Sequence, residues 1–170
     1  MSPVLRWREP TSVDDLFLYR LARLQAVAGS MVVRLCEGRF GITRREWRLL
    51  LILAEQGPLQ PSQLADQAQL DRTRTSRNIT SLAQKKLIER LPCTGDGRRT
   101  ILAVTESGRE LHAALFPQVA DINRALLAGL PDAEVDRLAH SLRVLVERAQ
   151  AMDVAMDLPN AGRGLRRTAK

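Results

Sequence analysis

Hydrophobic residues recur along most of the chain at intervals of three and four, a pattern that predicts amphipathic helices. The longest run, from Leu16 to Leu35, predicts a helix of more than about five turns. This helix is expected to begin at Thr11 or Ser12, because Ser12 and Asp15 have the spacing of a capping box. Further helices are predicted over residues 44–55, 60–68, 71–86, 106–116 and 131–146.

The periodicity changes after residue 86. Apolar residues at 87, 88 and 91, and again from 100 to 104, predict two short strands on either side of residues 94–99. That segment contains Gly-Asp-Gly, which favours a hairpin turn because glycine takes the positive φ that such turns require. Pro117 is expected to bend or interrupt the helix that follows the hairpin. The predicted fold class is therefore mainly α with a small β-hairpin.

Basic residues are concentrated in the middle of the chain. The net charge of +7 favours a polyanionic partner. Residues 71–99 contain eight basic and three acidic side chains, whereas residues 100–159 contain five basic and nine acidic ones. More basic residues lie in the tail after residue 160. A solvated helix surface would explain scattered charge, but it explains this segregation less well.

Composition narrows the class of protein. A chain of 170 residues fits one domain that can bury a core without disulfides or a structural metal. Cys36 and Cys93 are far apart in the sequence and no secretory segment precedes them, so a reduced, cytoplasmic location is expected. No apolar run reaches the roughly 18 residues of a membrane span. The two histidines, His112 and His140, belong to no metal or catalytic motif, so no enzyme, cofactor or metal is predicted.

The order helix, turn, polar helix and basic hairpin is typical of a winged helix-turn-helix. A helix fits the major groove of DNA, where polar and basic side chains bond base edges and phosphates. The narrow hairpin suits the minor groove, whose negative potential attracts arginine. The predicted DNA contacts are Ser62, Arg72, Thr73, Arg74, Ser76, Arg77, Asn78, Asp96, Arg98 and Arg99.

These residues resemble the MarR family of bacterial regulators over positions 40–111. The recognition-helix pattern of that family is matched by Leu70, Asp71, Ser76, Arg77, Ile79 and Leu82. Its wing is matched by Asp96 and Arg98, and the start of the next helix by Val104, Thr105 and Gly108. The resemblance implies that Arg98 enters the minor groove and that Asp96 positions it. Two positions depart from the pattern: Lys86 stands where glycine is common, and Asn78 where leucine is common.

The resemblance also implies an architecture. Residues 1–39 would form an N-terminal segment and dimerisation helix, 40–111 the winged helix-turn-helix, 112–158 the C-terminal dimerisation helices, and 159–170 a basic disordered tail. The protein would bind double-stranded DNA as a homodimer, at a palindromic operator in the bacterial nucleoid. Its function would be transcriptional repression that a small ligand relieves.

Members of the family commonly bind aromatic or phenolic acids. Arg20, Arg23 and Arg34 on the first long helix could pair with a carboxylate, and Trp47 could supply an apolar wall. Two alternatives remain open at this stage. Cys36 would make the protein a redox-sensing regulator if its thiol were exposed and its pKa lowered. A non-specific architectural DNA-binding protein would instead depend on phosphate contacts and on the basic tail.

Overall fold

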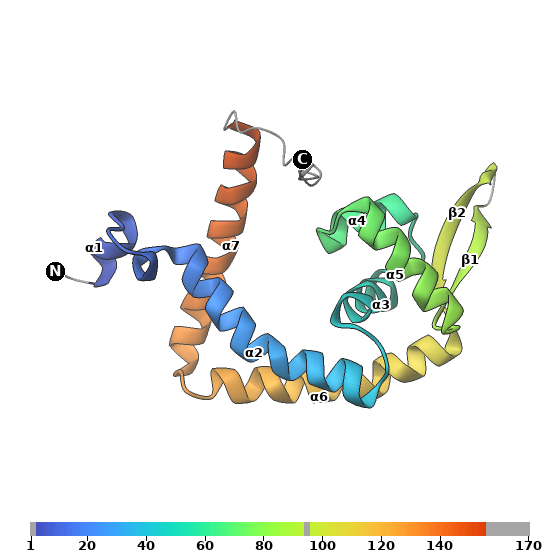
Figure 1. Ribbon diagram of the computed structural model, residues 1–170, viewed down its shortest axis with the longest axis horizontal. Helices are drawn as coiled ribbons and strands as arrows, with labels where there is room; N and C mark the ends of the chain where they lie inside the picture. Colours follow the sequence, from blue (N-terminus) through green and yellow to red (C-terminus); the bar gives the residue numbers. More distant parts are fainter. Residues whose placement is uncertain (1–2, 94–95, 156–170) are drawn as a thin grey trace, which may run out of the picture. The chain divides into compact units, whose positions relative to one another are not determined.

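A computed structural model describes the backbone of residues 3–93 and 96–155, and the side chains of residues 6–92 and 100–152. The chain divides into two compact units, Met1–Leu126 and Leu127–Lys170. The first unit contains helices α1 (Pro3–Arg8), α2 (Phe17–Arg39), α3 (Arg44–Gln56), α4 (Pro61–Ala68) and α5 (Arg72–Gln84), strands β1 (Ile88–Cys93) and β2 (Asp96–Val104), and all but the last residue of α6 (Glu106–Leu127). Helix α7 (Asp132–Ala155) belongs to the second unit (Figure 1).

The beginning of the long helix differs from the prediction. The carboxylate of Asp15 accepts hydrogen bonds from the backbone N–H and the hydroxyl of both Thr11 and Ser12. These bonds close a single 3-10 turn, η1 (Val13–Asp15), and the extended backbone of Leu16 then separates this turn from α2. The capping box is therefore present as predicted, but it caps η1, and the long helix begins only at Phe17.

Helices α3, α4 and α5 begin where their local sequences predict. Thr43 caps α3: its hydroxyl accepts from the Glu46 backbone N–H, and the Glu46 carboxylate accepts from the Thr43 N–H. Pro61 occupies the first turn of α4, where its missing donor costs nothing. The carboxylate of Asp71 accepts from the Arg74 N–H at 2.8 Å and caps α5. These bonds satisfy donors that helix ends otherwise leave unpaired.

The two strands form the predicted antiparallel hairpin and extend further towards its tip than the apolar residues indicate. Ile88 pairs with Val104 and Leu91 with Ile101, and the register shifts between Pro92 and Cys93. The base of the hairpin is joined to the loop before α4, because Leu59 and Leu102 exchange two backbone hydrogen bonds of 3.1 and 2.8 Å. The hairpin is therefore fixed to the helix-turn-helix through its own backbone.

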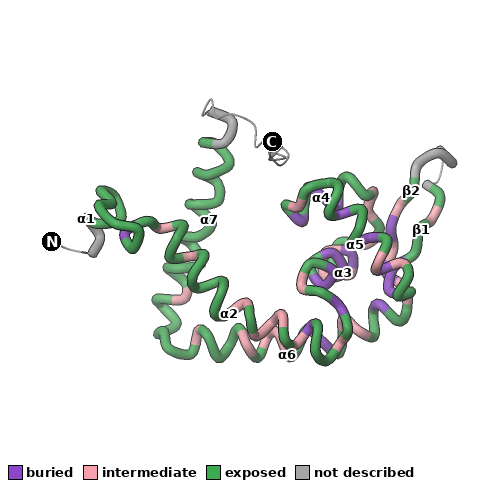
Figure 2. Tube along the Cα trace, in the orientation of Figure 1, coloured by how far each residue is buried: buried purple, intermediate pink, exposed green. Residues whose placement is uncertain are grey.

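The hydrophobic core lies between α3, α4, α5 and the base of the hairpin, where the buried segments gather (Figure 2). The end of α2 and the first half of α6 complete it. Its fully buried large side chains are Ile42, Leu49, Leu50, Leu53, Leu64, Leu82, Ile88, Leu102 and Leu115. In contrast, α7 and the first half of α2 are mostly exposed in the single chain.

Helix α6 runs through Pro117 to Leu127, so the prediction that the helix is interrupted at this residue is wrong. Proline removes the bond that its N–H would donate to the carbonyl of Ala113. Both residues are exposed, so water can reach that carbonyl. Leu115 and Val119, on either side of the proline, both pack on the core. The packing holds the helix together through the proline.

Lys86 has a left-handed backbone with φ of 59°. It follows α5 and leads into β1, at the position where glycine was expected from the resemblance. A non-glycine side chain is disfavoured at positive φ, so this position is strained relative to glycine. No helix in the described part of the chain is long and apolar enough to cross a membrane.

Candidate nucleic-acid interface

Helix α5 has one buried and one exposed face. Thr75, Ile79 and Leu82 point into the core, and the Thr75 hydroxyl donates to the backbone carbonyl of Asp71 at 2.9 Å. None of these three is a predicted DNA contact. The predicted DNA contacts on this helix are exposed at Arg72, Thr73, Arg74, Ser76 and Arg77, and half-buried at Asn78. Arg74 pairs with Asp71 at 3.2 Å, which ties its guanidinium to the beginning of the helix. A polar, basic helix face is thus presented to solvent on a core-anchored helix.

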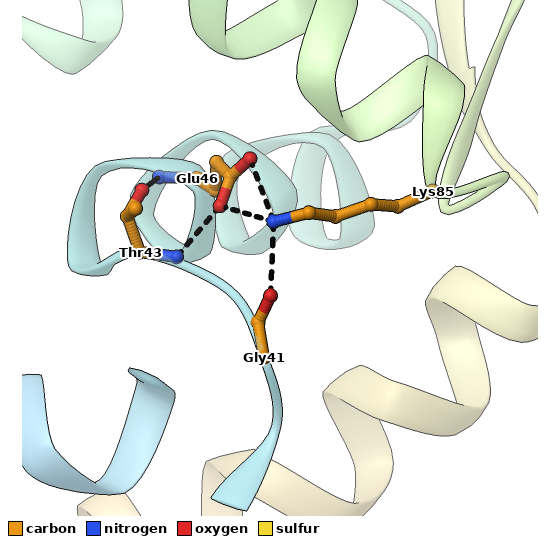
Figure 3. Close-up of polar contacts among 4 residues, drawn as sticks. All are labelled: Gly41, Thr43, Glu46 and Lys85. Carbon is orange, nitrogen blue, oxygen red and sulfur yellow. Dashed lines mark hydrogen bonds and ion pairs between the residues drawn. The ribbon is translucent and has the colours of Figure 1, made fainter. Parts of the chain in front are cut away.

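The end of α5 is fixed by a buried carboxylate on α3. The ammonium group of Lys85 donates to both carboxylate oxygens of Glu46, at 2.9 and 3.1 Å, and to the carbonyl of Gly41 at 2.9 Å (Figure 3). The same carboxylate caps the beginning of α3 through the Thr43 N–H, at 2.6 Å. The Glu46 side chain therefore links the start of α3 to the end of α5 and fixes how the two helices meet.

The ionisation of Glu46 depends on these contacts. Burial raises the pKa of this carboxyl group, whose side chain is only 2% exposed. Hydrogen bonds from Ser81, Lys85 and Thr43, together with the positive charge of Lys85, outweigh burial and hold the pKa below its ordinary value. The carboxylate is therefore charged at neutral pH.

A cavity of about 280 Å³ lies between α4, α5 and the hairpin. The predicted contact Ser62 lines it, together with Arg72 and Ser76 of α5. Arg90 and Thr100 of the hairpin line its other side and were not among the predicted residues. Arg90 is one of the eight basic residues of segment 71–99, and this concentration of charge is the only sequence signal that could have pointed to it.

The wing residues Asp96, Arg98 and Arg99 lie in β2. Their side chains fall outside the described residues, so the roles assigned to them remain predictions. The basic tail of residues 159–170 also lies outside the described part of the chain.

The segment that contains these elements matches known proteins. A model of the MarR family matches residues 40–99. The HTH-type transcriptional regulator FarR of Neisseria gonorrhoeae is 35% identical over 78 residues, which are 46% of this chain and 53% of that protein. Residues 40–99 form a DNA-binding segment of the MarR family. Another relative, the homoprotocatechuate degradative operon repressor of Escherichia coli, is 26% identical over 127 residues, 74% of this chain and 86% of that protein.

The MarR fold is also found in solved structures. A MarR family transcriptional regulator from Streptomyces coelicolor, solved in complex with DNA, superposes with a TM-score of 0.70 at 23% identity, over 80% of this chain and 88% of that one. The similarity confirms the predicted fold, mainly helical with a two-stranded wing. The MarR family comprises DNA-binding transcriptional regulators, so the predictions of a DNA-binding regulator and of no enzyme are confirmed at the level of the family.

The first unit also contains a larger, mainly apolar cavity of about 650 Å³ between α2, α6 and the start of α3. Leucine, valine, isoleucine and alanine side chains form most of its wall. Its charged lining residue is Arg44, accompanied by the amides of Gln25 and Asn123. An apolar space with one cationic side chain suits a small organic anion.

The four predicted ligand residues do not line this cavity. Arg20 donates to the backbone carbonyl of Asp14, and Arg23 pairs with the Asp14 carboxylate at 3.3 Å. Arg34 is exposed. Trp47 of α3 is 5% exposed and stacks on His112 of α6, with ring centroids 5.4 Å apart. The residue that the sequence reasoning missed is Arg44, because nothing local indicates that it reaches back over α2.

The structure gives Cys36 the environment of an inert thiol. Its side chain is fully buried in the core at the end of α2. Burial raises the pKa of the thiol, and the nearby charge of Glu37 raises it further. A sensing cysteine needs a lowered pKa and access to the oxidant. The redox alternative therefore finds no support at Cys36.

Proposed function

We propose that the protein is a sequence-specific repressor that binds a palindromic operator as a homodimer and is released by a small aromatic acid. The observation that supports DNA recognition is the exposed face of α5. Thr73, Ser76 and Arg77 lie on that face within the first two turns, opposite the buried residues that anchor the helix. This is the part of a recognition helix that reaches base edges in the major groove.

The dimer is supported by apolar side chains that are exposed in the single chain. Leu18 and Val27 of α2 are 76% and 73% exposed. On α7, the exposed large apolar residues are Leu138, Leu142, Val144, Leu145, Val146 and Met152. A second copy of the chain would cover such faces, and a two-fold dimer would place two recognition helices about one DNA turn, roughly 34 Å, apart.

The effector is proposed to bind in the cavity between α2, α3 and α6. Its apolar wall would hold an aromatic ring, and the guanidinium of Arg44 would pair with the carboxylate. The name of the E. coli relative, a repressor of a homoprotocatechuate degradative operon, agrees with an aromatic acid as the effector class.

The test is a fluorescence-anisotropy titration of the DNA upstream of the protein's own gene against a scrambled fragment of equal length, near physiological salt. Specific recognition predicts tighter binding to the first fragment, and one of a panel of aromatic acids is expected to release it. Arg44→Gln should abolish that release while leaving operator affinity intact, and Arg34→Gln, an exposed arginine of α2 that does not line the cavity, is the matched control.

A non-specific architectural function predicts a different result. Sequence-independent binding depends on phosphates, so both fragments would bind equally and with the same salt dependence. A repressor loses about 1 to 3 kcal/mol for each mismatched base pair. Equal affinity for the two fragments, followed by no enrichment in a genome-wide fragment selection, would refute the proposed function.

A further inference from the structure

A second cavity of about 570 Å³ adjoins the apolar effector cavity. The two share three lining residues, Ala22, Gln25 and Arg44, so they meet along one side of α2. The second cavity differs in character from the first, because Arg45 and Arg48 of α3 add two more guanidinium groups to its wall. Glu37 is the one acidic residue that lines it. We call this space the cationic cavity.

The arginines of the cationic cavity are available for a ligand. Among the described residues, no carboxylate lies within ion-pair distance of Arg44, Arg45 or Arg48. Arg45 and Arg48 are exposed, and Arg44 is half-buried. Arg48 makes one hydrogen bond, of 3.2 Å, to the carbonyl of Ala68, and its remaining donors stay free within the described structure. Three cations are thus gathered on two turns of one helix around a hollow.

Gly29 keeps Arg44 at the junction of the two cavities. A Cβ at position 29 would lie 2.6 Å from a terminal nitrogen of the Arg44 guanidinium. Only a glycine lets this guanidinium rest against the backbone of α2, where it borders the apolar and the cationic cavity at once. The absence of a side chain at position 29 therefore lets the Arg44 guanidinium lie where the two cavities meet.

We propose that the cationic cavity binds a phosphate group, so that the two cavities together take an effector with an apolar body and a phosphate-bearing head. A carboxylate carries one charge and two acceptor oxygens, which Arg44 alone can satisfy. A phosphate monoester carries up to two charges and three terminal oxygens, and guanidinium groups bind it bidentately. Three arginines around one cavity therefore fit a phosphate monoester better than a carboxylate. This inference extends the effector cavity of the proposed function.

The location connects such a ligand to the DNA-binding elements. Arg48 holds the carbonyl of Ala68 at the last residue of α4. Leu70, which also lines the cationic cavity, precedes the Asp71 cap of the recognition helix. A phosphate that draws Arg48 towards itself competes with the bond to Ala68, and it does so beside the turn between the two helices of the helix-turn-helix.

The proposal is tested by calorimetric titration of the full chain, without DNA, with three probes: 1-naphthyl phosphate, 1-naphthoate and inorganic phosphate. The pH should be about 7.5, above the second pKa of about 6 of a phosphate monoester. Naphthyl phosphate is expected to bind at least about tenfold more tightly than naphthoate, the ordinary worth of one added charge-assisted hydrogen bond. Inorganic phosphate alone should bind weakly, because it leaves the apolar cavity empty.

Variants separate the two cavities. Arg45→Gln and Arg48→Gln should each weaken naphthyl phosphate about tenfold and leave naphthoate unchanged, whereas Arg44→Gln should weaken both probes. Arg34→Gln is the control, since it removes an exposed arginine that lines neither cavity. Gly29→Ala should weaken both probes without lowering the unfolding midpoint, because alanine favours the helix and the displaced group is the end of a flexible side chain.

Three results would overturn the proposal. The first is equal affinity for the phosphate and the carboxylate probe, and the second is an equal loss of phosphate binding in Arg34→Gln and Arg45→Gln. The third would appear in DNA titrations: if Arg45→Gln lowers the salt dependence of DNA binding by one phosphate contact and does not affect the probes, the arginines bind the DNA backbone. Probe binding without operator recognition would instead refute only the proposed repressor function.

Discussion

The contact between Lys85 and Glu46 allows the stability of a variant to be predicted from the structure. Replacing Lys85 by methionine keeps most of the length of the aliphatic side chain and removes its charge. The Glu46 carboxylate, 2% exposed, would then keep the Thr43 N–H and the Ser81 hydroxyl but lose the cation that bonds both of its oxygens. The carbonyl of Gly41 would lose the same donor. The variant should therefore be less stable.

The expected loss lies below that of a fully buried pair. Removing one partner of a buried ion pair costs about 3 to 5 kcal/mol, because an unpaired charge remains inside the protein. The Lys85 side chain is 36% exposed, so water can partly replace it beside Glu46. A loss of about 2 kcal/mol is expected, between the values for buried and surface pairs. Glu46→Gln should cost less than Lys85→Met, since it leaves no charge buried.

Urea unfolding at neutral pH measures these differences, and Arg77→Met, an exposed arginine on the same helix, controls for the loss of one positive charge. The double variant of Lys85→Met with Glu46→Gln should cost less than the two single losses together, because both remove the same pair. Additive losses, or a loss in Lys85→Met no larger than in Arg77→Met, would show that the pair does not hold α3 and α5 together.

The pH dependence provides a second check. The folded-state pKa of Glu46 is lowered from 4.5, so its contribution to stability is complete above that value and is lost as the pH falls through the folded pKa. In Lys85→Met the largest attractive charge is gone and burial remains, which raises the folded pKa. The difference in stability between wild type and variant should shrink in acid, and a constant difference down to the acid transition would refute the reasoning.

Four further outcomes are expected. Lys86→Gly should raise the free energy of unfolding by about 1 kcal/mol, since φ is 59° at this residue; thermal or urea unfolding tests it, and no gain would contradict it. Gly108→Ala should lower stability, because a Cβ would lie 2.1 Å from the backbone oxygen of Leu87, which is not a flexible group; an unchanged unfolding midpoint would argue against that close approach. Arg77→Ala should weaken operator binding and relax base preference, whereas a uniform loss on every DNA sequence would reduce its role to a phosphate contact. Arg98→Ala should weaken DNA binding without changing the dimer in sedimentation, and an unchanged affinity would exclude the wing from recognition.

The elements that sequence analysis predicted well are those whose causes are local. Thr43 and Asp71 lie at the helix starts that they cap, and each hydrogen bond involved spans only three residues. The faces of α5 follow from periodicity alone, which separates the buried Thr75 and Ile79 from the exposed Arg77. The DNA-reading face was therefore accessible from the sequence.

The two errors in helix boundaries have non-local causes. Ser12 and Asp15 make the bonds of a capping box whether a helix or a single turn follows, and only the extended backbone of Leu16 decides between them. A proline interrupts a helix when no tertiary packing holds that helix together. On either side of Pro117, however, Leu115 and Val119 pack on a core that is assembled mostly from other elements. Neither outcome is visible in a window of neighbouring residues.

The effector cavities show the same limit more strongly. In the sequence, Arg44 is only the first residue of a helix and has no special feature. The other candidates, Arg20, Arg23 and Arg34, are three similar cations on one long helix, and the sequence does not distinguish among them. Folding places Arg44 against Gly29, fifteen positions earlier in the chain, and the missing Cβ there leaves the room for its guanidinium. A glycine in the middle of a helix costs about 1 kcal/mol relative to alanine, so its presence in α2 calls for a compensating contact. The contact with Arg44 meets that need, and an unexplained glycine in a long helix is thus the one sequence signal that could have directed attention to this side of α2.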